Sequence, residues 1–397
     1  MAKNMNVLVS GASIAGPALA YWLHHYGFNA TVVEQAPEIR DGGYAVDLRG
    51  TAVEVTKRMG LFETIKEGGT GVDGISYVDV NNKVKGSLGK DFLGGSGVVA
   101  EVEILHGDLS RILYDATKDY TEYVFGDSIT SLTETADGVE VTFERGAPRT
   151  FDYVFGADGL HSNVRALTFG DESRFIHHLG YYMAIFTTEN HLNLDHWECF
   201  YNMPGKAAGM QSARGNSEAM AMFHWSSDPL FYDRHDIEQQ KKILLDVFSG
   251  ESWEIPRLLK ALPDATDFFF DSIAQVKMDD WAKGRIALVG DAAHSSSVLS
   301  GMATSMALVG AYIVVGELQA HLDNHETAFK NYREDMREYV ELNHKIGAGN
   351  ATGLMPKTNF AIWRRNFLVR MMPYIPGKEK FLGAYEKAAN AAVLKDY

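Results

Sequence analysis

The sequence contains almost no cysteine. Cys199 carries the only thiol among 397 residues, so no internal disulfide can form and no group of thiolates can hold zinc or an iron–sulfur cluster. The fourteen histidines show no His-Glu-x-x-His pattern, which is the spacing typical of zinc hydrolases. We therefore expect no metal in the chemistry of this protein.

Net positive charge and long apolar runs are also lacking. A formal charge of −15 argues against nucleic-acid binding, which needs a basic surface. The longest apolar helix candidate, Met306 to Leu318, contains Gly310 and Gly316 and is too short to span a bilayer, so it predicts a buried helix. Residues 1–4 lead into a strand without an apolar signal region. The simplest expectation is a cytoplasmic protein without a nucleic-acid or membrane partner.

The most informative stretch that is present runs from Met5 to Glu34. The apolar run Val7 to Val9 predicts a strand, and a glycine-containing turn from Gly11 to Gly16 follows it. A helical pattern comes next, and residues 30–34 form a second strand that ends in the acid. This order of strand, turn, helix, strand and acid is the dinucleotide-binding fingerprint of a βαβ unit.

Each position in this unit has a physical role. Gly11 permits the tight turn, Gly16 lets the helix pack closely on the strand, and the helix N-terminus presents N–H groups to a pyrophosphate. Glu34 can accept hydrogen bonds from an adenosine ribose, which favours FAD or NAD over NADP at this turn. One position departs from the fingerprint, because Ser13 replaces its middle glycine.

Two further acids follow apolar strand candidates. Asp158 stands in Gly-Ala-Asp-Gly after residues 153–156, and Asp291 follows Gly290 after residues 285–289. Each would lie at the carboxyl end of a parallel strand, where ligands of open α/β sheets bind. Either acid alone could simply cap a helix, but the three elements in this order indicate a cofactor site.

The alternation of patterns predicts a discontinuous α/β protein with an inserted, sheet-rich region. Hydrophobic residues make up 46% and charged residues 22% of the chain, which is ordinary for a soluble globular protein. The expected dinucleotide-binding domain comprises residues 1–73, 105–173 and 277–355. The expected antiparallel-sheet domain comprises residues 74–104 and 174–276, and residues 356–397 form a basic helical extension.

On these three motifs the chain resembles the class A flavoprotein monooxygenases, which have the p-hydroxybenzoate hydroxylase fold. Within them it is most similar to the tetracycline-inactivating monooxygenases, through residues 43–60, 103–113 and 284–318 and the helical C-terminal extension. The resemblance implies a Rossmann-like FAD-binding domain, a second antiparallel-sheet substrate domain and C-terminal helices. Polyketide hydroxylases share much of this pattern, so that function stays open as an alternative.

The resemblance also implies which residues bind the cofactor. By this resemblance, the glycine turn binds the pyrophosphate and Glu34 binds the ribose. Asp47 lies near the flavin, Asp291 binds the ribityl chain and Asp158 supports the cofactor. The helix that starts near Gly301 points its N-terminus toward the pyrimidine edge of the flavin. The expected cofactor-binding residues are Gly11, Ser13, Ile14, Ala15, Gly16, Glu34, Gln35, Arg40, Asp47, His106, Asp158, Asp291, Gly301, Ala303 and Thr304. Three positions depart from the family: His106 stands for an arginine, Val298 for a proline and Ala303 for a glycine.

The implied reaction is a hydroxylation. NAD(P)H would reduce FAD, O₂ would add at flavin C4a, and the resulting hydroperoxide would transfer one oxygen to a polycyclic aromatic or enolic small molecule, plausibly a tetracycline. Gln211, Arg214 and His224 are polar candidates for substrate contact. Phe223 and Trp225 could line the cleft, although packing in the core is the better interpretation. We expect a monomer or weak homodimer.

Two other functions stay open, a reductase without oxygen transfer and a flavin protein that only sequesters its ligand, because fold does not determine function. Residues 253–256 match the end of the flavin halogenase signature, but Glu251 stands where that signature needs a second tryptophan, so we treat this match as accidental. In the C-terminal extension, Trp363 and Phe367 alternate with arginines. This pattern predicts either a helix that bridges both domains or a membrane-contacting helix.

Overall fold

A parallel sheet organises the first unit of the protein. The computed structural model describes residues 5–39, 43–89, 100–374 and 378–397. The sheet has the strand order β17-β18-β11-β1-β2-β7, and only the β17–β18 pair is antiparallel. Its strands are β1 (Asn6–Ser10), β2 (Asn29–Glu34), β7 (Glu122–Phe125), β11 (Tyr153–Gly156), β17 (Ala282–Lys283) and β18 (Ile286–Leu288). Residues 7–9 are fully buried because the central strands of a parallel sheet are covered on both faces.

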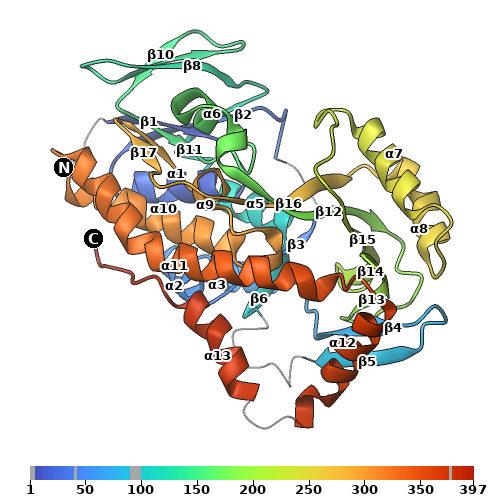
Figure 1. Ribbon diagram of the computed structural model, residues 1–397. Coiled ribbons are helices and arrows are strands. Elements are labelled where there is room, and N and C mark those ends of the chain that lie inside the picture. The colour runs from blue at the N-terminus through green and yellow to red at the C-terminus, as the bar shows by residue number, and fades with distance from the viewer. Residues whose placement is uncertain (1–4, 40–42, 90–99, 375–377) are drawn as a thin grey trace.

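Helices pack against this sheet. The elements of this unit include α1 (Ala15–His25), α2 (Thr51–Arg58), α3 (Phe62–Glu67), α5 (His106–Asp115), α6 (Asn163–Phe169), α9 (Asp291–His294), α10 (Ala303–Ala320) and α11 (His325–Leu354). Helix α10 lies between α1 and α11 (Figure 1). It is the one described helix that is long and apolar enough to cross a membrane by composition, yet 83% of it is buried inside the protein. The prediction of a buried helix is therefore confirmed.

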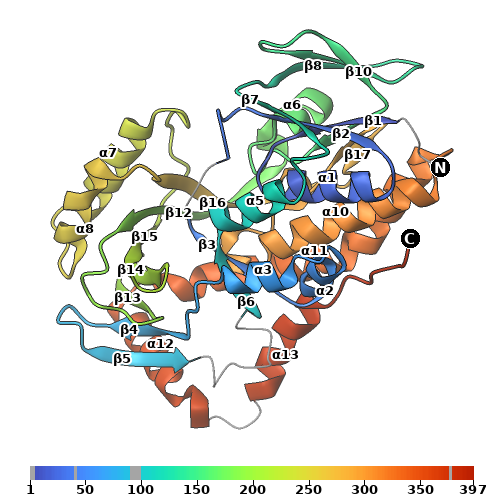
Figure 2. The ribbon, with the colours of Figure 1, turned by 180° about the vertical axis from the view of Figure 1, so that it is seen from behind.

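A second, seven-stranded sheet forms the other large unit, in the order β16-β12-β15-β14-β13-β4-β5. Its strands are β4 (Gly74–Val78), β5 (Val84–Gly89), β12 (Ile176–Thr188), β13 (Glu198–Met203), β14 (Lys206–Ala213), β15 (Glu218–Ser226) and β16 (Phe269–Val276). Helices α7 (Ile237–Phe248) and α8 (Ile255–Ala261) lie on its outer side, away from the first unit (Figures 1 and 2). All but one of its pairings are antiparallel. The expected α/β fold with an inserted sheet is confirmed.

Two small sheets complete the arrangement. Strands β8 (Ile129–Glu134), β9 (Val139–Phe143) and β10 (Arg149–Phe151) form a three-stranded sheet at the top of the molecule (Figure 1). Strands β3 (Ala45–Leu48) and β6 (Val102–Leu105) pair antiparallel, between the parallel sheet and the second sheet. Residues of this two-stranded ribbon line the cavity between the two units. The predicted turn at Gly94 to Gly97 lies outside the described residues.

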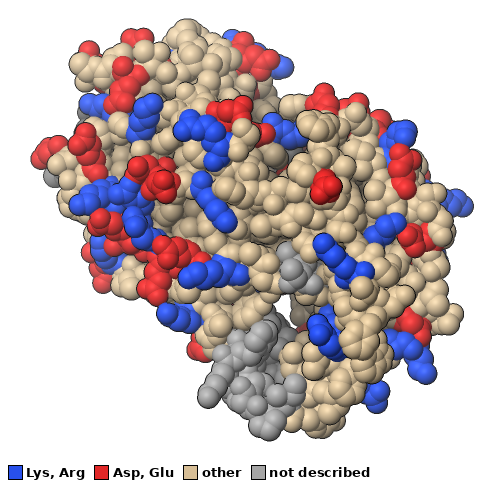
Figure 3. Space-filling model, in the orientation of Figure 1, with Lys and Arg blue, Asp and Glu red and all other residues tan. Residues whose placement is uncertain are grey.

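The C-terminal extension contacts both units, but through two helices rather than one. Helix α12 (Asn359–Met371) packs against β5, and its Arg365 guanidinium lies 3.7 Å from the centre of the Tyr77 ring. Helix α13 (Lys378–Ala389) packs against α11. On the face shown in Figure 3, basic and acidic side chains are mixed, and the described residues form no continuous basic surface there.

Candidate active site

One cavity of about 810 Å³ lies where the two units meet. It begins at the turn after β1, passes the β3–β6 ribbon and ends against the second sheet. Of the expected cofactor-binding residues that the structure describes, all except Gly16 line it. Gly16 lies behind the turn, and Arg40 lies outside the described residues. The predicted residues from three distant parts of the chain therefore share one space.

The turn after β1 is built around glycine. Gly11 has a φ of +102°, and a Cβ placed on it would lie 2.5 Å from the Ala157 carbonyl oxygen. A Cβ on Gly16 would collide with the Gly11 carbonyl. No side chain caps α1 at Ile14, so the first N–H groups of this helix stay available to an anion. The turn thus has the close packing and the open helix end that a pyrophosphate requires.

Glu34, at the end of β2, stabilises the same turn through hydrogen bonds. Its carboxylate accepts hydrogen bonds of 2.8 Å from the backbone N–H groups of Ala12 and Ala36. These bonds hold the acid at the cavity wall, at the end of the strand where the acid of a dinucleotide-binding unit hydrogen-bonds the adenosine ribose.

Asp158 mainly stabilises the loop in which it lies. It accepts hydrogen bonds from the Ser162 hydroxyl, from the Val164 N–H at 3.0 Å and from the Ser10 hydroxyl at 3.3 Å. Burial raises the pKa of Asp158, and these hydrogen bonds partly offset that shift. The residue lines the cavity, but its main visible role is to tie the end of β11 to β1 and α6.

Asp291 opens α9 on the neighbouring strand end and faces the cavity. Burial raises the pKa of Asp291, a hydrogen bond with Ser295 lowers it as the next largest effect, and the nearby charge of Asp271 raises it further. Gly301 adopts the left-handed conformation with φ of +64°, and α10 then starts without a side-chain cap. A Cβ at Gly301 would lie 2.8 Å from an Asp47 oxygen. The start of α10 therefore presents free N–H groups beside Asp47.

Ser13, which departs from the dinucleotide-binding fingerprint, contacts His106, which departs from the family pattern. The Ser13 hydroxyl and His106 Nε2 lie 3.0 Å apart, and the His106 ring lies 5.3 Å from that of Tyr44. A serine at the turn and a histidine at the start of α5 thus form one local contact across the cofactor end of the cavity. The sequence alone could not relate residues that are 93 positions apart.

Strand register decides which residues of the second sheet face the cavity. Gln211 lies opposite Glu198, and His224 lies opposite Met183; all four line the cavity. Because side chains alternate between faces, the neighbours of His224 point the other way. Phe223 is fully buried in the core under α7, with Trp225. The expectation that Phe223 contacts substrate does not fit this placement.

Arg214 also lies away from the cavity. Its guanidinium forms ion pairs with Asp108 at 3.3 Å and with Glu218 at 2.7 Å, and 44% of its side chain is exposed. It stands just after β14 ends, with a φ of +48°. Of the four predicted substrate residues, only Gln211 and His224 therefore line the cavity.

Two half-buried carboxyl groups at the cavity wall were missed in the sequence. Glu103 of β6 accepts hydrogen bonds from Thr70 at 2.6 Å and from Gln211 at 2.5 Å. Glu198 of β13 lies nearby, and burial raises the pKa of both carboxyl groups well above their usual range. Neighbouring negative charges add to the shift, from Asp47 for both and from Glu103 for Glu198. The sequence does hold one signal for Glu198: it stands two residues before Phe200 on the same strand, so both side chains point to the same face of the sheet.

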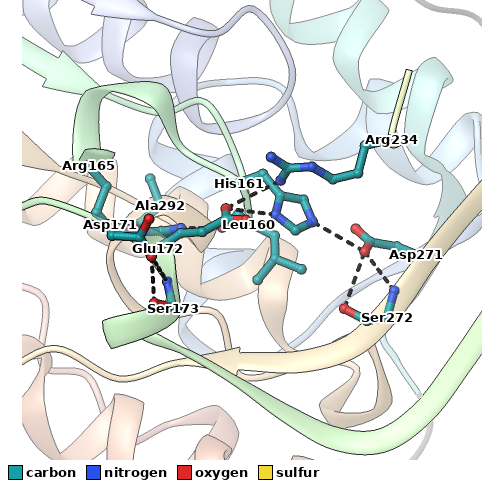
Figure 4. Close-up of polar contacts among 10 residues, drawn as sticks. All are labelled: Leu160, His161, Arg165, Asp171, Glu172, Ser173, Arg234, Asp271, Ser272 and Ala292. Carbon is teal, nitrogen blue, oxygen red and sulfur yellow. Dashed lines mark hydrogen bonds and ion pairs between the residues drawn. The ribbon is translucent and has the colours of Figure 1, made fainter. Parts of the chain in front are cut away.

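A histidine joins the two units at another edge of the cavity. His161 lies between Glu172 and Asp271, at 3.0 and 3.3 Å (Figure 4). Arg234, just before α7, approaches the same Glu172 oxygen at 3.3 Å. Burial by itself lowers the pKa of His161, but the hydrogen bonds and charges of Asp271 and Glu172 outweigh burial and raise it. The link is thus strongest when the imidazole is protonated.

This link predicts a pH-dependent stability difference. Replacing His161 with Gln should lower the free energy of unfolding by about 0.5–1 kcal/mol at pH 6, since the ion pair is partly exposed. A raised folded-state pKa means that the stabilisation is fully present below the ordinary value near 6.5 and is lost as the pH rises through the folded value. Urea unfolding from pH 5.5 to 9 measures it.

The control for this experiment is His235→Gln, which removes an exposed histidine paired with Asp233. It should change the unfolding free energy little at any pH. A deficit for His161→Gln that grows with rising pH would contradict the assignment.

The donor groups of the cavity fit FAD. The uncapped start of α1 suits the pyrophosphate, Glu34 suits the ribose, and the uncapped start of α10 suits the pyrimidine edge of a flavin, which carries negative charge when reduced. The glycine positions leave no room for side chains at the closest approaches. The cavity continues past this end to the wall formed by the second sheet.

Comparison with known proteins agrees with this geometry. Residues 4–343 match the family described as an FAD binding domain. A flavin-dependent monooxygenase from an unknown prokaryotic organism is 40% identical over 403 residues, covering all of both chains. Among solved structures, the tetracycline destructase Tet(51) is 33% identical with a TM-score of 0.84, covering all of both chains. The tetracycline destructase Tet(55) is 38% identical with a TM-score of 0.84 over 99% of each chain.

These matches extend over nearly the whole chain and include both units and the C-terminal helices. They therefore cover the fold and the cavity together. The chain belongs to the FAD-dependent monooxygenases of the class A flavoprotein type.

Proposed function

We propose that this enzyme consumes NAD(P)H and O₂ to hydroxylate a polycyclic aromatic or enolic molecule, and that tetracyclines are among its substrates. The observation that carries the proposal is the continuous cavity, which runs from the dinucleotide-binding turn to the wall of the second sheet. The full-length similarity to two tetracycline destructases supports this substrate class.

The chain's own residues would hold FAD at one end of the cavity. The N–H groups at the start of α1 and the Glu34 carboxylate would bind its adenosine half, and Asp291 would bind its ribityl chain. When bound, FAD would supply the redox chemistry, accepting electrons from NAD(P)H and activating O₂. The protein's task is then to position the substrate and to exclude water.

The substrate wall suits a flat, largely apolar molecule. Its apolar lining includes Met183, Ile185, Phe200, Met222 and Phe269 of the second sheet. His224 adds one polar group, because burial lowers its pKa to about 4 and so keeps the imidazole neutral at pH 7. Its Nδ1 is closed to solvent and has no hydrogen-bond partner among the described residues. Such a wall excludes water from bound substrate.

Mixing the FAD-loaded enzyme with NADH or NADPH and tetracycline in air tests the proposal. We expect tetracycline-dependent oxidation of the nicotinamide and a product that is heavier by one oxygen atom, detected by mass spectrometry. The control omits tetracycline and measures uncoupled oxidation. Tight tetracycline binding without either change would instead indicate a sequestering protein. A product formed only from other polycyclic phenols would indicate a biosynthetic hydroxylase.

A further inference from the structure

Three carboxyl groups gather at the sheet end of the cavity. Asp47 of β3 lies directly opposite Glu103 of β6 in the antiparallel ribbon, and Glu198 faces them from β13. Like charges directly opposite each other destabilise a strand pair. Arg49 forms an ion pair with Asp47 at 2.6 Å, which balances one of the three. Glu103 and Glu198 then have no positively charged partner of their own among the described residues, so this end of the cavity carries excess negative charge when they are ionised.

The hydrogen bonds at this end leave acceptors without donors. Gln211, which is only 4% exposed, donates its amide N–H to Glu103, and no described residue donates to its Oε1. Glu198 likewise accepts no side-chain hydrogen bond from the part of the chain that the structure describes. When ionised, as at pH 8, a carboxylate accepts but does not donate, and an amide oxygen only accepts. A ligand that satisfies them must therefore bring N–H or O–H donors.

The opposite end of the same wall has a second unsatisfied group. His224 is 5% exposed, and its Nδ1 has no hydrogen-bond partner in the part of the chain that the structure describes. Gln211 lies opposite Met220, four residues before His224 on β15, so the two ends are roughly 14 Å apart at about 3.4 Å per residue. Phe200 lies between them on the cavity side. The wall is thus long enough for several fused rings, with one end acidic.

We propose that Glu198 and Glu103, with the Gln211 amide oxygen, form a recognition site for the ammonium group of a polycyclic substrate. The inference rests on the proposed function and narrows it to amine-bearing substrates. An alkylammonium would donate to the unsatisfied acceptors and neutralise the excess negative charge. The Phe200 ring, two residues from Glu198 on the same face of β13, would contact its alkyl groups.

The test compares tetracycline with its analogue that lacks the dimethylamino group. Calorimetry on the FAD-loaded enzyme without NAD(P)H should show about tenfold tighter binding of tetracycline at pH 8, as expected for one charge-assisted hydrogen bond. Glu198→Gln should bring the ratio of dissociation constants close to one. The matched control Glu140→Gln, an exposed change on β9, should leave the ratio unchanged.

A pH series on the unaltered enzyme supports the test even if Glu198→Gln fails to fold. Ionisation of the carboxyl groups should make the ratio larger at pH 8 than at pH 6. The charged and titratable groups that surround Glu198 are Asp47, Arg49, Glu103 and Tyr77, with Arg365 behind Tyr77. Equal binding of both compounds, a ratio that shrinks with rising pH, or an unchanged ratio in Glu198→Gln would overturn this inference alone. Binding of neither compound would overturn the tetracycline-type function and this inference with it.

Discussion

Replacing Gly11 with Ala should largely abolish FAD binding. The residue has a φ of +102°, and an added Cβ would meet the backbone of Ala157 and Asp158 at 2.5–3.0 Å. Backbone atoms cannot rotate away as a side chain can, so the turn itself must shift. Strain of about 1–3 kcal/mol at such a position corresponds to a loss of about 5- to 150-fold in affinity. Titration of the apoprotein with FAD, followed by flavin fluorescence, measures the loss.

Gly27→Ala is the matched control. Gly27 follows the end of the same helix, α1, and has a φ of +85°, but apart from its chain neighbours no atom of the described residues lies within 4 Å of its added Cβ. Its backbone strain should lower the thermal stability and leave FAD affinity within about twofold of the original value. If both variants bound FAD equally well, the turn would not be the pyrophosphate site.

Replacing Phe223 with Ala should cost about 3–5 kcal/mol of unfolding free energy. Its side chain is fully buried, lies 6.0 Å from the ring of Phe186 and packs edge-on against Phe248 of α7 at 4.9 Å. The truncation would leave a cavity that two sheet residues and a helix cannot easily close. Equilibrium unfolding in urea measures the change, and FAD binding should persist in the protein that remains folded.

The adjacent variant His224→Ala provides the contrast. His224 Nδ1 has no hydrogen bond to any described residue, and the side chain faces the cavity, so the unfolding free energy should change by about 1 kcal/mol or less. Substrate affinity should fall instead. Similar stability losses in the two variants would mean that both residues belong to the core, and that the register described for β15 does not decide which one meets the ligand.

Much of the cofactor end of the cavity was predictable because its signals are local. Gly11, Gly16 and Glu34 lie within one βαβ unit, where spacing along the chain determines spacing in the structure. The strand-end acids Asp158 and Asp291 could be placed because adjacent parallel strands end at the same edge of a sheet. That the two acids lie close together could therefore be predicted without knowing how the side chains pack.

The substrate end was much less predictable. Strand β15 reads Ala-Met-Ala-Met-Phe-His-Trp between its end residues, and both of its faces are buried. Apolar alternation therefore could not say whether Phe223 or His224 faces the cavity. The pairing of β15 with β12 and β14 settles it.

By itself, the sequence determined the dinucleotide-binding unit, the order of the three strand-end motifs and the buried character of α10, because each depends on residues close together in the chain. Only the tertiary structure decided that Ser13 meets His106, that His161 joins the two units, and that Glu103 and Glu198 share one wall. These contacts connect residues about 100 positions apart. Their geometry depends on how whole sheets dock, which no local pattern encodes.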